Sequence, residues 1–301
     1  MPKNVPLLSW YDINTIKHLR FPFSFFLLPV FLFALSQAIK INWPATTISF
    51  IILHLFIFPS SNGYNSYQDK DETSIGGLKY PPKVTKNLYY VTLLLDVTGI
   101  LAAMLVSVYF SLLILLFVIM SRSYSYRNIR LKKYPIIGFL TVFIFQGAFV
   151  YLMAYSAITN FTAEIFTSYN IICMCVSSLF IGSIYPLTQI YQHEADKKDG
   201  VISISYKLGY IGTFIFSAIL FTIALLIMFY YFNLKHQQMA IIIFLLIMLP
   251  VIIKLSIWLN KVRQDTANAN FDNAMAINIL TSTCMNSFFI ILILNNYYTW
   301  F

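Results

Sequence analysis

Long apolar runs recur along almost the whole chain and limit its possible folds more than any other feature. Most of them are close to the roughly 20 residues that an α-helix needs to cross the hydrocarbon core of a bilayer. Of the 301 residues, 59% are hydrophobic and only 10% are charged, whereas a soluble domain carries about 25% charged residues. We therefore predict an all-α, polytopic membrane protein with spans at 21–39, 43–61, 88–121, 135–158, 168–191, 206–232, 239–259 and 274–294.

The run at 88–121 is too long for a single span. Its 34 residues, at about 1.5 Å of helical rise each, exceed the thickness of the bilayer core. We predict a hairpin of two helices here, with a turn that the residues themselves do not locate. The expected total is then about nine transmembrane helices.

The positive charges support this count independently, because cytoplasmic loops carry an excess of Lys and Arg. With the N-terminus inside, 18 of the 20 basic residues fall on one side, and only Lys40 and Lys235 fall on the other. We predict that the N-terminus and the loops near residues 70, 128, 198 and 263 are cytoplasmic, in a bacterial-type inner or plasma membrane. The aromatic C-terminal segment 295–301 is then outside. The orientation of the protein in the membrane and its attraction to anionic lipids explain the net charge of +9, so no nucleic-acid partner is implied.

More than half of the 11 acidic residues lie in two short segments, 62–83 and 191–209, at predicted inside ends of helices. Both segments also contain lysines. Carboxylates can hold Mg²⁺, which in turn binds phosphate, while lysines neutralise the remaining phosphate oxygens. Charged loops are also the default at helix ends, so this pattern alone leaves a merely solvated surface equally open.

Spacing within these segments favours a site. Asn65 and Asp69 are four residues apart, as are Gln192 and Asp196. Residues four apart share one face of a helix. Each helix end therefore offers an amide and a carboxylate, and the two ends can approach one diphosphate from opposite sides.

Four segments, taken together, carry a family resemblance. The first acidic motif reads Asn65-x-x-x-Asp69-x-Asp71-Glu72 and continues to Gly76-Gly77-Leu78-Lys79-Tyr80-Pro81. The second reads Gln192-x-x-x-Asp196-x-x-x-Gly200-x-x-Ser203 and closes with Leu208-Gly209. A basic element, Arg130-Leu131-Lys132-Lys133-Tyr134-Pro135, lies between them, and Leu19-Arg20-Phe21-Pro22 enters the first helix. In this order, over nearly the whole chain, they resemble the signatures of the UbiA superfamily of intramembrane prenyltransferases.

The chain departs from the family pattern where it lacks three carboxylates, at Ser66, Thr73 and Gln192. Acidic residues at neighbouring positions are candidates to replace the missing charge: Asp71, Glu72 and Glu194.

The resemblance implies a single domain, 1–301, whose helices surround a lipid-accessible cavity with an active site at its cytoplasmic mouth. It implies Mg²⁺ as cofactor and an isoprenoid diphosphate as substrate. The catalytic residues would be Asn65, Asp69 and Asp196. The metal ligands would be Asn65, Asp69, Glu72, Gln192 and Asp196, and the diphosphate contacts would come from Lys79, Lys132 and Arg130.

Three functions remain open at this point. The first is transfer of a prenyl group to an aromatic or other lipophilic acceptor. The second is a membrane terpene cyclase of the same fold, in which the allylic cation is captured by its own double bonds. A transporter is a distant third, because we find no internal repeat and the charged clusters lie at one face of the membrane, away from the midplane.

Three polar residues lie apart from these motifs. Asp96 falls within an apolar span, where an acidic group is costly and functional by default. Catalysis and structural hydrogen bonding are equally open for it. His54, in the middle of the second span, is expected to be a packing residue, and His193 is expected to lie off the face shared by Gln192 and Asp196.

Overall fold

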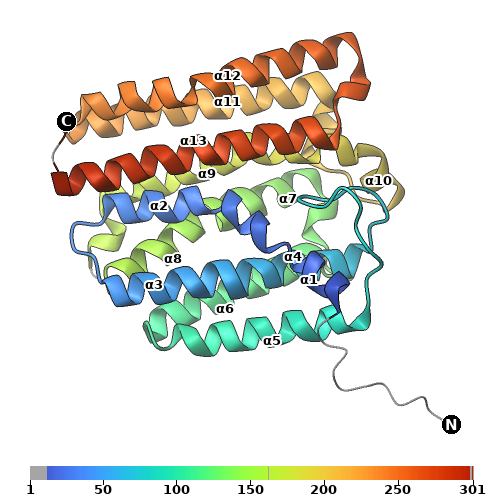
Figure 1. Ribbon diagram of the computed structural model, residues 1–301, viewed down its shortest axis with the longest axis horizontal. Coiled ribbons are helices and arrows are strands. Elements are labelled where there is room, and N and C mark those ends of the chain that lie inside the picture. Colours follow the sequence, from blue (N-terminus) through green and yellow to red (C-terminus); the bar gives the residue numbers. More distant parts are fainter. Residues whose placement is uncertain (1–11, 162, 299, 301) are drawn as a thin grey trace.

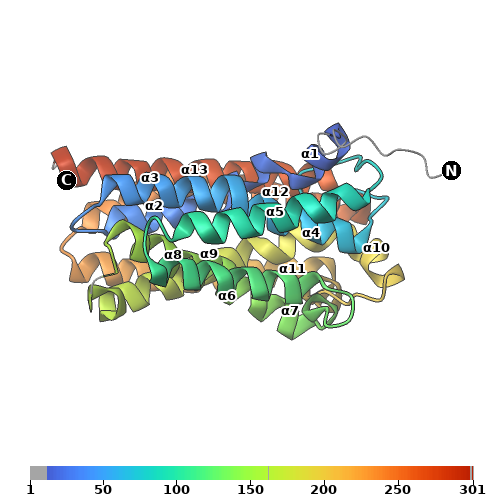
Figure 2. The same cartoon turned by 90° about the horizontal axis from the view of Figure 1, so that it is seen from below.

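The computed structural model describes residues 12–161, 163–298 and 300. In this part of the chain, the only β-structure is an isolated bridge between Ile75 and Leu78, and the rest is helix, turn and loop. The long helices lie side by side along one axis and form a single bundle (Figures 1 and 2). The predicted all-α fold class is confirmed.

The helices follow each other closely along the chain. The first part contains α1 (Ile13–Leu19), η2 (Phe21–Phe26), α2 (Leu28–Gln37), α3 (Trp43–Ile51), η3 (Ile52–Ile57), α4 (Phe58–Asp69), α5 (Lys86–Ala103) and α6 (Val108–Ser125). The middle part contains η4 (Leu131–Lys133), α7 (Pro135–Val142), η5 (Phe143–Ala148), α8 (Phe149–Ile158), η6 (Ala163–Phe166) and α9 (Ser168–Gln189). The last part contains η7 (Ile190–Gln192), α10 (His193–Lys198), α11 (Ile204–Leu234), α12 (Gln238–Gln264), η8 (Thr266–Asn268) and α13 (Phe271–Tyr298).

Seven helices in the described residues are long and apolar enough to cross a membrane. An eighth span is added if the segment Ile13–Phe26, which contains α1 and η2, is taken together with α2, which it meets at a bend of 40°. α5 is less apolar and packs against α4 and α6; counting it gives the nine expected helices. The predicted hairpin is present, because α5 ends at Ala103 and α6 begins at Val108. The Ser107 hydroxyl accepts a hydrogen bond from the Phe110 amide at 3.0 Å and caps α6.

Two of the spans contain a π-helical turn. η3 joins α3 to α4, and η5 joins α7 to α8. η3 places His54 among three phenylalanines, with its ring stacked 4.5 Å from Phe50. This environment is that of a packing residue.

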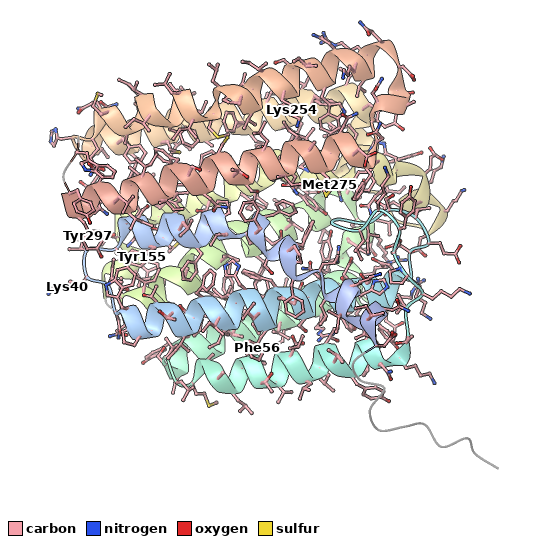
Figure 3. All side chains as sticks on the ribbon, viewed as in Figure 1. Lys40, Phe56, Tyr155, Lys254, Met275 and Tyr297 are labelled. Atoms are coloured by element: carbon pink, nitrogen blue, oxygen red, sulfur yellow. The ribbon has the colours of Figure 1, made fainter. Side chains whose placement is uncertain are left out.

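The charged loops gather at one end of the bundle. This end holds the loop after α4, the segment before α7, and α10 (Figure 1), whereas Lys40 lies at the opposite end (Figure 3). Lys254 was expected at the charged end of the bundle, but it does not lie there. It lies along α12, well before that helix ends at Gln264, and its ammonium is 3.5 Å from the Ala276 carbonyl oxygen.

This segregation of charge gives a prediction of topology. Single cysteines replacing Thr73 and Lys198, both exposed, should react with a membrane-impermeant maleimide from the same side, in a background lacking the native cysteines. A cysteine replacing Lys40 should react only from the other side, because it lies at the opposite end of the bundle. Labelling of the first two from opposite sides would exclude a shared active site.

Asp96 forms a buried ion pair that joins three helices. Its carboxylate, with 8% of the side chain exposed, accepts a hydrogen bond from the Arg122 Nε at 2.8 Å. The same guanidinium lies 3.8 Å from the centre of the Tyr64 ring and donates to the Thr92 hydroxyl at 3.3 Å. α4, α5 and α6 are therefore held together, and Asp96 has a structural role because it does not line the cavity described below.

Asp96→Ala should destabilise the protein by about 3 kcal/mol, because it leaves the half-buried Arg122 charge without its partner. The double variant Asp96→Leu/Arg122→Leu should lose less stability, since both charges are removed together. Detergent unfolding followed by circular dichroism measures both effects. A double variant that is less stable than Asp96→Ala would contradict this assignment.

Candidate active site

A cavity of about 210 Å³ opens at the charged end of the bundle. Its wall is built by η2, α4, η4, α6, α7, η5, α9, η7, α10 and α13, together with the loop after α4. Carboxylates and Lys132 line its mouth, whereas residues from the middle of the helices, such as Phe58, Phe117 and Ile181, line its interior. A charged mouth therefore opens into an apolar chamber.

Five of the residues predicted from the sequence meet at this mouth: Asn65, Asp69, Lys132, Gln192 and Asp196. They are brought together because α4 continues past its apolar part as far as Asp69, and because α10 begins directly after Gln192. The amide of Asn65 is fixed by a hydrogen bond from its Nδ2 to the Ser125 hydroxyl on α6, at 3.0 Å.

Three other predicted residues do not line the cavity. Glu72 is exposed on the loop after α4. The ammonium of Lys79 is 2.6 Å from the Asp272 carboxylate at the start of α13, because the loop turns through a left-handed residue at Gly77 (φ 83°). Arg130 is turned toward the carboxylates that flank the site.

Arg130 connects the two acidic segments. Its guanidinium is 3.3 Å from Asp69 Oδ1 and is ion-paired with Asp199, whose backbone oxygen it also contacts at 2.9 Å. Arg127 reinforces this link by donating from its Nε to the Gln68 carbonyl at 2.8 Å. Arg130 has a left-handed backbone (φ 47°), a conformation costly for a side chain of this type. The segment between α6 and α7 thus holds the ends of α4 and α10 side by side.

Arg20 lines the cavity as well, and the sequence did not assign it a role. It is 8% exposed, and it donates to the Gly76 carbonyl at 2.9 Å and to the Asn62 carbonyl at 2.8 Å. A Cβ added at Gly76 would lie 2.7 Å from the Phe23 ring, so the loop packs tightly on η2. Arg20 therefore fastens the loop after α4 to the cavity mouth. The only signal in the sequence was its place in the motif that enters the first helix.

The mouth of the cavity is rich in negative charge. Burial, and to a smaller extent the neighbouring Asp69 carboxylate, raises the pKa of Asp71 to about 6, against the opposing effect of Lys132. Asp71, which the sequence offered only as a replacement ligand, lines the cavity. A divalent cation at this position would relieve the repulsion between the carboxylates.

The donor set fits Mg²⁺, which prefers oxygen ligands. The mouth offers the carboxylates of Asp69, Asp71 and Asp196 and the amide oxygens of Asn65 and Gln192. Among the described residues, no three acidic, His or Cys side chains are close enough to form a metal shell by themselves. Mg²⁺ commonly takes one or two carboxylates and completes its shell with water and substrate phosphates. The site is therefore suited to a metal that arrives with a phosphate ligand.

His193 lies off the face that Gln192 and Asp196 share, as expected. Its ring stacks on Tyr210 at 4.9 Å, and its Nε2 is 2.8 Å from the Ser205 hydroxyl on α11. The Gln192 amide next to it points the other way and donates to the Ser74 carbonyl at 3.2 Å. His193 thus anchors α10 to α11, while Gln192 joins the second acidic segment to the loop of the first.

Comparison with known proteins decides the family. The model of the UbiA prenyltransferase family matches residues 24–280, most of the chain. The chain belongs to this family. It is accordingly an integral membrane protein of the UbiA type. No curated protein sequence matches it.

Several solved structures of UbiA proteins share the fold. A digeranylgeranylglyceryl phosphate synthase is 18% identical, with a TM-score of 0.58 over 94% of this chain and 97% of that chain. A UbiA homologue from Archaeoglobus fulgidus bound to GPP and Mg²⁺ is 17% identical, with a TM-score of 0.65 over 93% and 99%. The same values of TM-score and coverage are found for a homologue from that organism bound to DMAPP and Mg²⁺, at 16% identity.

The missing carboxylate at Gln192 gives a prediction about metal affinity. Gln192→Asp should bind Mg²⁺ roughly tenfold more tightly, because affinity for hard cations rises with ligand charge. Isothermal titration of the purified variants measures this in the presence of geranyl thiolodiphosphate, a substrate analogue that resists ionisation. Glu194→Gln is the control, since Glu194 is exposed and outside the cavity wall. Equal affinities for Gln192→Asp and the unchanged protein would place Gln192 outside the metal site.

Proposed function

We propose that this protein is a Mg²⁺-dependent intramembrane prenyltransferase that ionises an isoprenoid diphosphate and transfers the prenyl group to an aromatic or other lipophilic acceptor. The observation that carries the proposal is the cavity itself. Carboxylates and amides from both acidic segments meet Lys132 at its mouth, and its interior is apolar. A diphosphate suits the mouth, and an isoprenoid chain suits the interior.

In this proposal, Asn65, Asp69, Gln192 and Asp196 hold the metal. Asp71 takes the place of Glu72, because Asp71 lines the cavity whereas Glu72 is exposed. Bound Mg²⁺ would neutralise the charge that develops on the departing diphosphate.

Lys132 is the basic residue placed to contact a phosphate oxygen. It lines the cavity and is ion-paired with Asp69, so a diphosphate at the mouth would share its ammonium. Arg130 and Lys79 would act indirectly. Arg130 is ion-paired with both Asp69 and Asp199, and Lys79 is ion-paired with Asp272, which holds the loop after α4 against the start of α13. Each positions other groups without touching the substrate.

The chamber beyond the mouth would protect the reactive cation. Water adds readily to an allylic cation, and the walls formed by Phe58, Phe117 and Ile181 exclude it. The electron-rich faces of the two phenylalanines can also stabilise positive charge. We place this site on the cytoplasmic side, with the C-terminus outside, following the distribution of Lys and Arg.

A terpene cyclase would use the same ionisation and needs no acceptor. Family membership is compatible with both reactions, and the related structures with GPP or DMAPP and Mg²⁺ bear on the ionisation step shared by both. A transporter is less well supported, because the charged groups lie at one end of the bundle and the cavity opens there.

The proposal is tested by incubating purified protein with dimethylallyl, geranyl, farnesyl or geranylgeranyl diphosphate, Mg²⁺ and a lipophilic phenol as acceptor, and measuring release of diphosphate. Chelation by EDTA should stop it. Asp69→Asn and Asp196→Asn should each lower the rate by at least about 100-fold, because each removes a charged metal ligand at the leaving group.

Asp265→Asn is the matched control, since it makes the same change at an exposed residue outside the cavity wall, where asparagine can still cap η8. It should keep nearly the full rate. Release of diphosphate that survives Asp69→Asn, or that proceeds equally well in EDTA, would contradict the proposed function.

A further inference from the structure

Lys254 places a positive charge on the lipid-facing surface of the bundle. It is exposed on α12, where that helix packs beside α13 (Figure 3). It lies ten residues before Gln264, the last residue of α12, and so about 15 Å inward of that helix end. Its neighbours Ile253 and Ile257 are each 51% exposed. Lys254 therefore lies among side chains that face the hydrocarbon of the bilayer, away from the wall of the main cavity.

Within the described residues, the ammonium of Lys254 forms no ion pair. It lies 3.5 Å from the Ala276 carbonyl oxygen on α13, beyond the usual hydrogen-bond range of about 2.7–3.2 Å. The acidic side chain one turn before Ala276, Asp272, is already paired with Lys79. A charge exposed to hydrocarbon is costly, so an anion from outside the chain would stabilise Lys254.

A second lysine, Lys261, lies on the same face of α12 and is also exposed. Residues seven apart in a helix share a face, and here they are two turns, or about 10 Å, apart. Lys261 lies nearer to the end of α12, beyond its apolar part, whereas Lys254 lies deeper. Each ammonium is carried on a flexible four-carbon stem. The two can therefore reach one phosphate group that lies between them.

The surface that continues from these lysines toward the middle of the bilayer is apolar. On α12, Pro250 and Leu246 lie four and eight residues before Lys254, on the same side of the helix, and both are exposed. On α13, Ile279 lies one turn beyond Ala276 and is 52% exposed. Two cations beside an apolar strip match a phospholipid, because its phosphate carries the negative charge and its acyl chain can cover the strip.

An acidic segment of another protein matches this surface less well. At the depth of Lys254, the backbone of such a segment would be exposed to hydrocarbon, where its amides and carbonyls find no partners. A phospholipid has no such cost, because its charged and apolar parts follow the same order as those of the surface. Attraction of lysines near the membrane surface to anionic lipids supplies the selectivity.

We propose that Lys254 and Lys261 form a binding site for an anionic phospholipid of the leaflet at the charged end of the bundle. The phosphate lies between the two ammonium groups, and an acyl chain lies along the exposed strip of α12 and α13. A zwitterionic lipid carries an additional positive group, which these lysines repel, so the site selects lipids by charge. The site is separate from the cavity and is independent of the reaction that the protein catalyses.

The test compares two lipids with the same acyl chains, palmitoyl-oleoyl phosphatidylglycerol and palmitoyl-oleoyl phosphatidylcholine. Purified full-length protein in a mild detergent, freed of copurified lipid, is titrated with each lipid. Native mass spectrometry counts the lipids bound and gives the dissociation constant of the first. We expect the first phosphatidylglycerol to bind at least about tenfold more tightly than the first phosphatidylcholine, the effect of two lysines near the membrane surface.

The double variant Lys254→Met/Lys261→Met should lower this preference to less than about threefold, because it removes both cations of the site. Lys254→Arg/Lys261→Arg keeps the charges and should keep the preference. Lys83→Met/Lys86→Met is the matched control: it removes two exposed lysines at the same end of the bundle, just before and at the start of α5. It should also keep the preference. Circular dichroism during thermal unfolding confirms that each variant is folded.

Three results would overturn the inference. The first is equal binding of the two lipids by the unchanged protein. The second is a preference that survives the loss of Lys254 and Lys261, or that falls as far in the control pair. The third is a dimer of the unchanged protein that the double variant converts to a monomer, since this face would then bind a second copy of the chain.

Discussion

The carboxylate of Asp69 needs a cation because only 6% of its side chain is exposed. A buried charge is stable only when it is paired and hydrogen-bonded. Its partners, Lys132 and Arg130, come from the segment between α6 and α7, and Arg130 also pairs with Asp199. The pairing thereby brings the end of α4 to α10. The remaining carboxylates, Asp71 and Asp196, then lie at the same cavity mouth.

The bilayer adds a second constraint, because backbone groups in hydrocarbon must be satisfied within the protein. Regular helices achieve this, and several departures from them lie around the cavity. η5 contributes Gln146 to its wall. Arg20, Lys70 and Arg130 all have left-handed backbones at helix ends near the mouth. Such conformations persist where surrounding contacts hold them, as the contacts of Arg20 and Arg130 do here.

Much of this arrangement could be predicted from the sequence, since the length of apolar runs and the side on which lysines fall are local properties. The hairpin at 88–121 and the meeting of Asn65 with Gln192 follow from them. The positions of Glu72 and Lys79 do not, because the loop after α4 is directed by a turn at Gly77 and by contacts with Arg20. The positions of Gln146 and Asn278 in the cavity wall were also missed. In helices that are apolar on all sides, no periodicity shows which residues face a cavity, and a π-turn shifts that face locally.

The central claim is that the two acidic segments form one metal site completed by a prenyl diphosphate. Titration with Mn²⁺ as a substitute for Mg²⁺, followed by the loss of the free-ion electron paramagnetic resonance signal, tests it most directly. We predict tight binding only when geranyl thiolodiphosphate is present, and loss of that binding in both Asp69→Asn and Asp196→Asn. Equally tight binding without the analogue, or binding that survives either substitution, would contradict a single site shared by both segments.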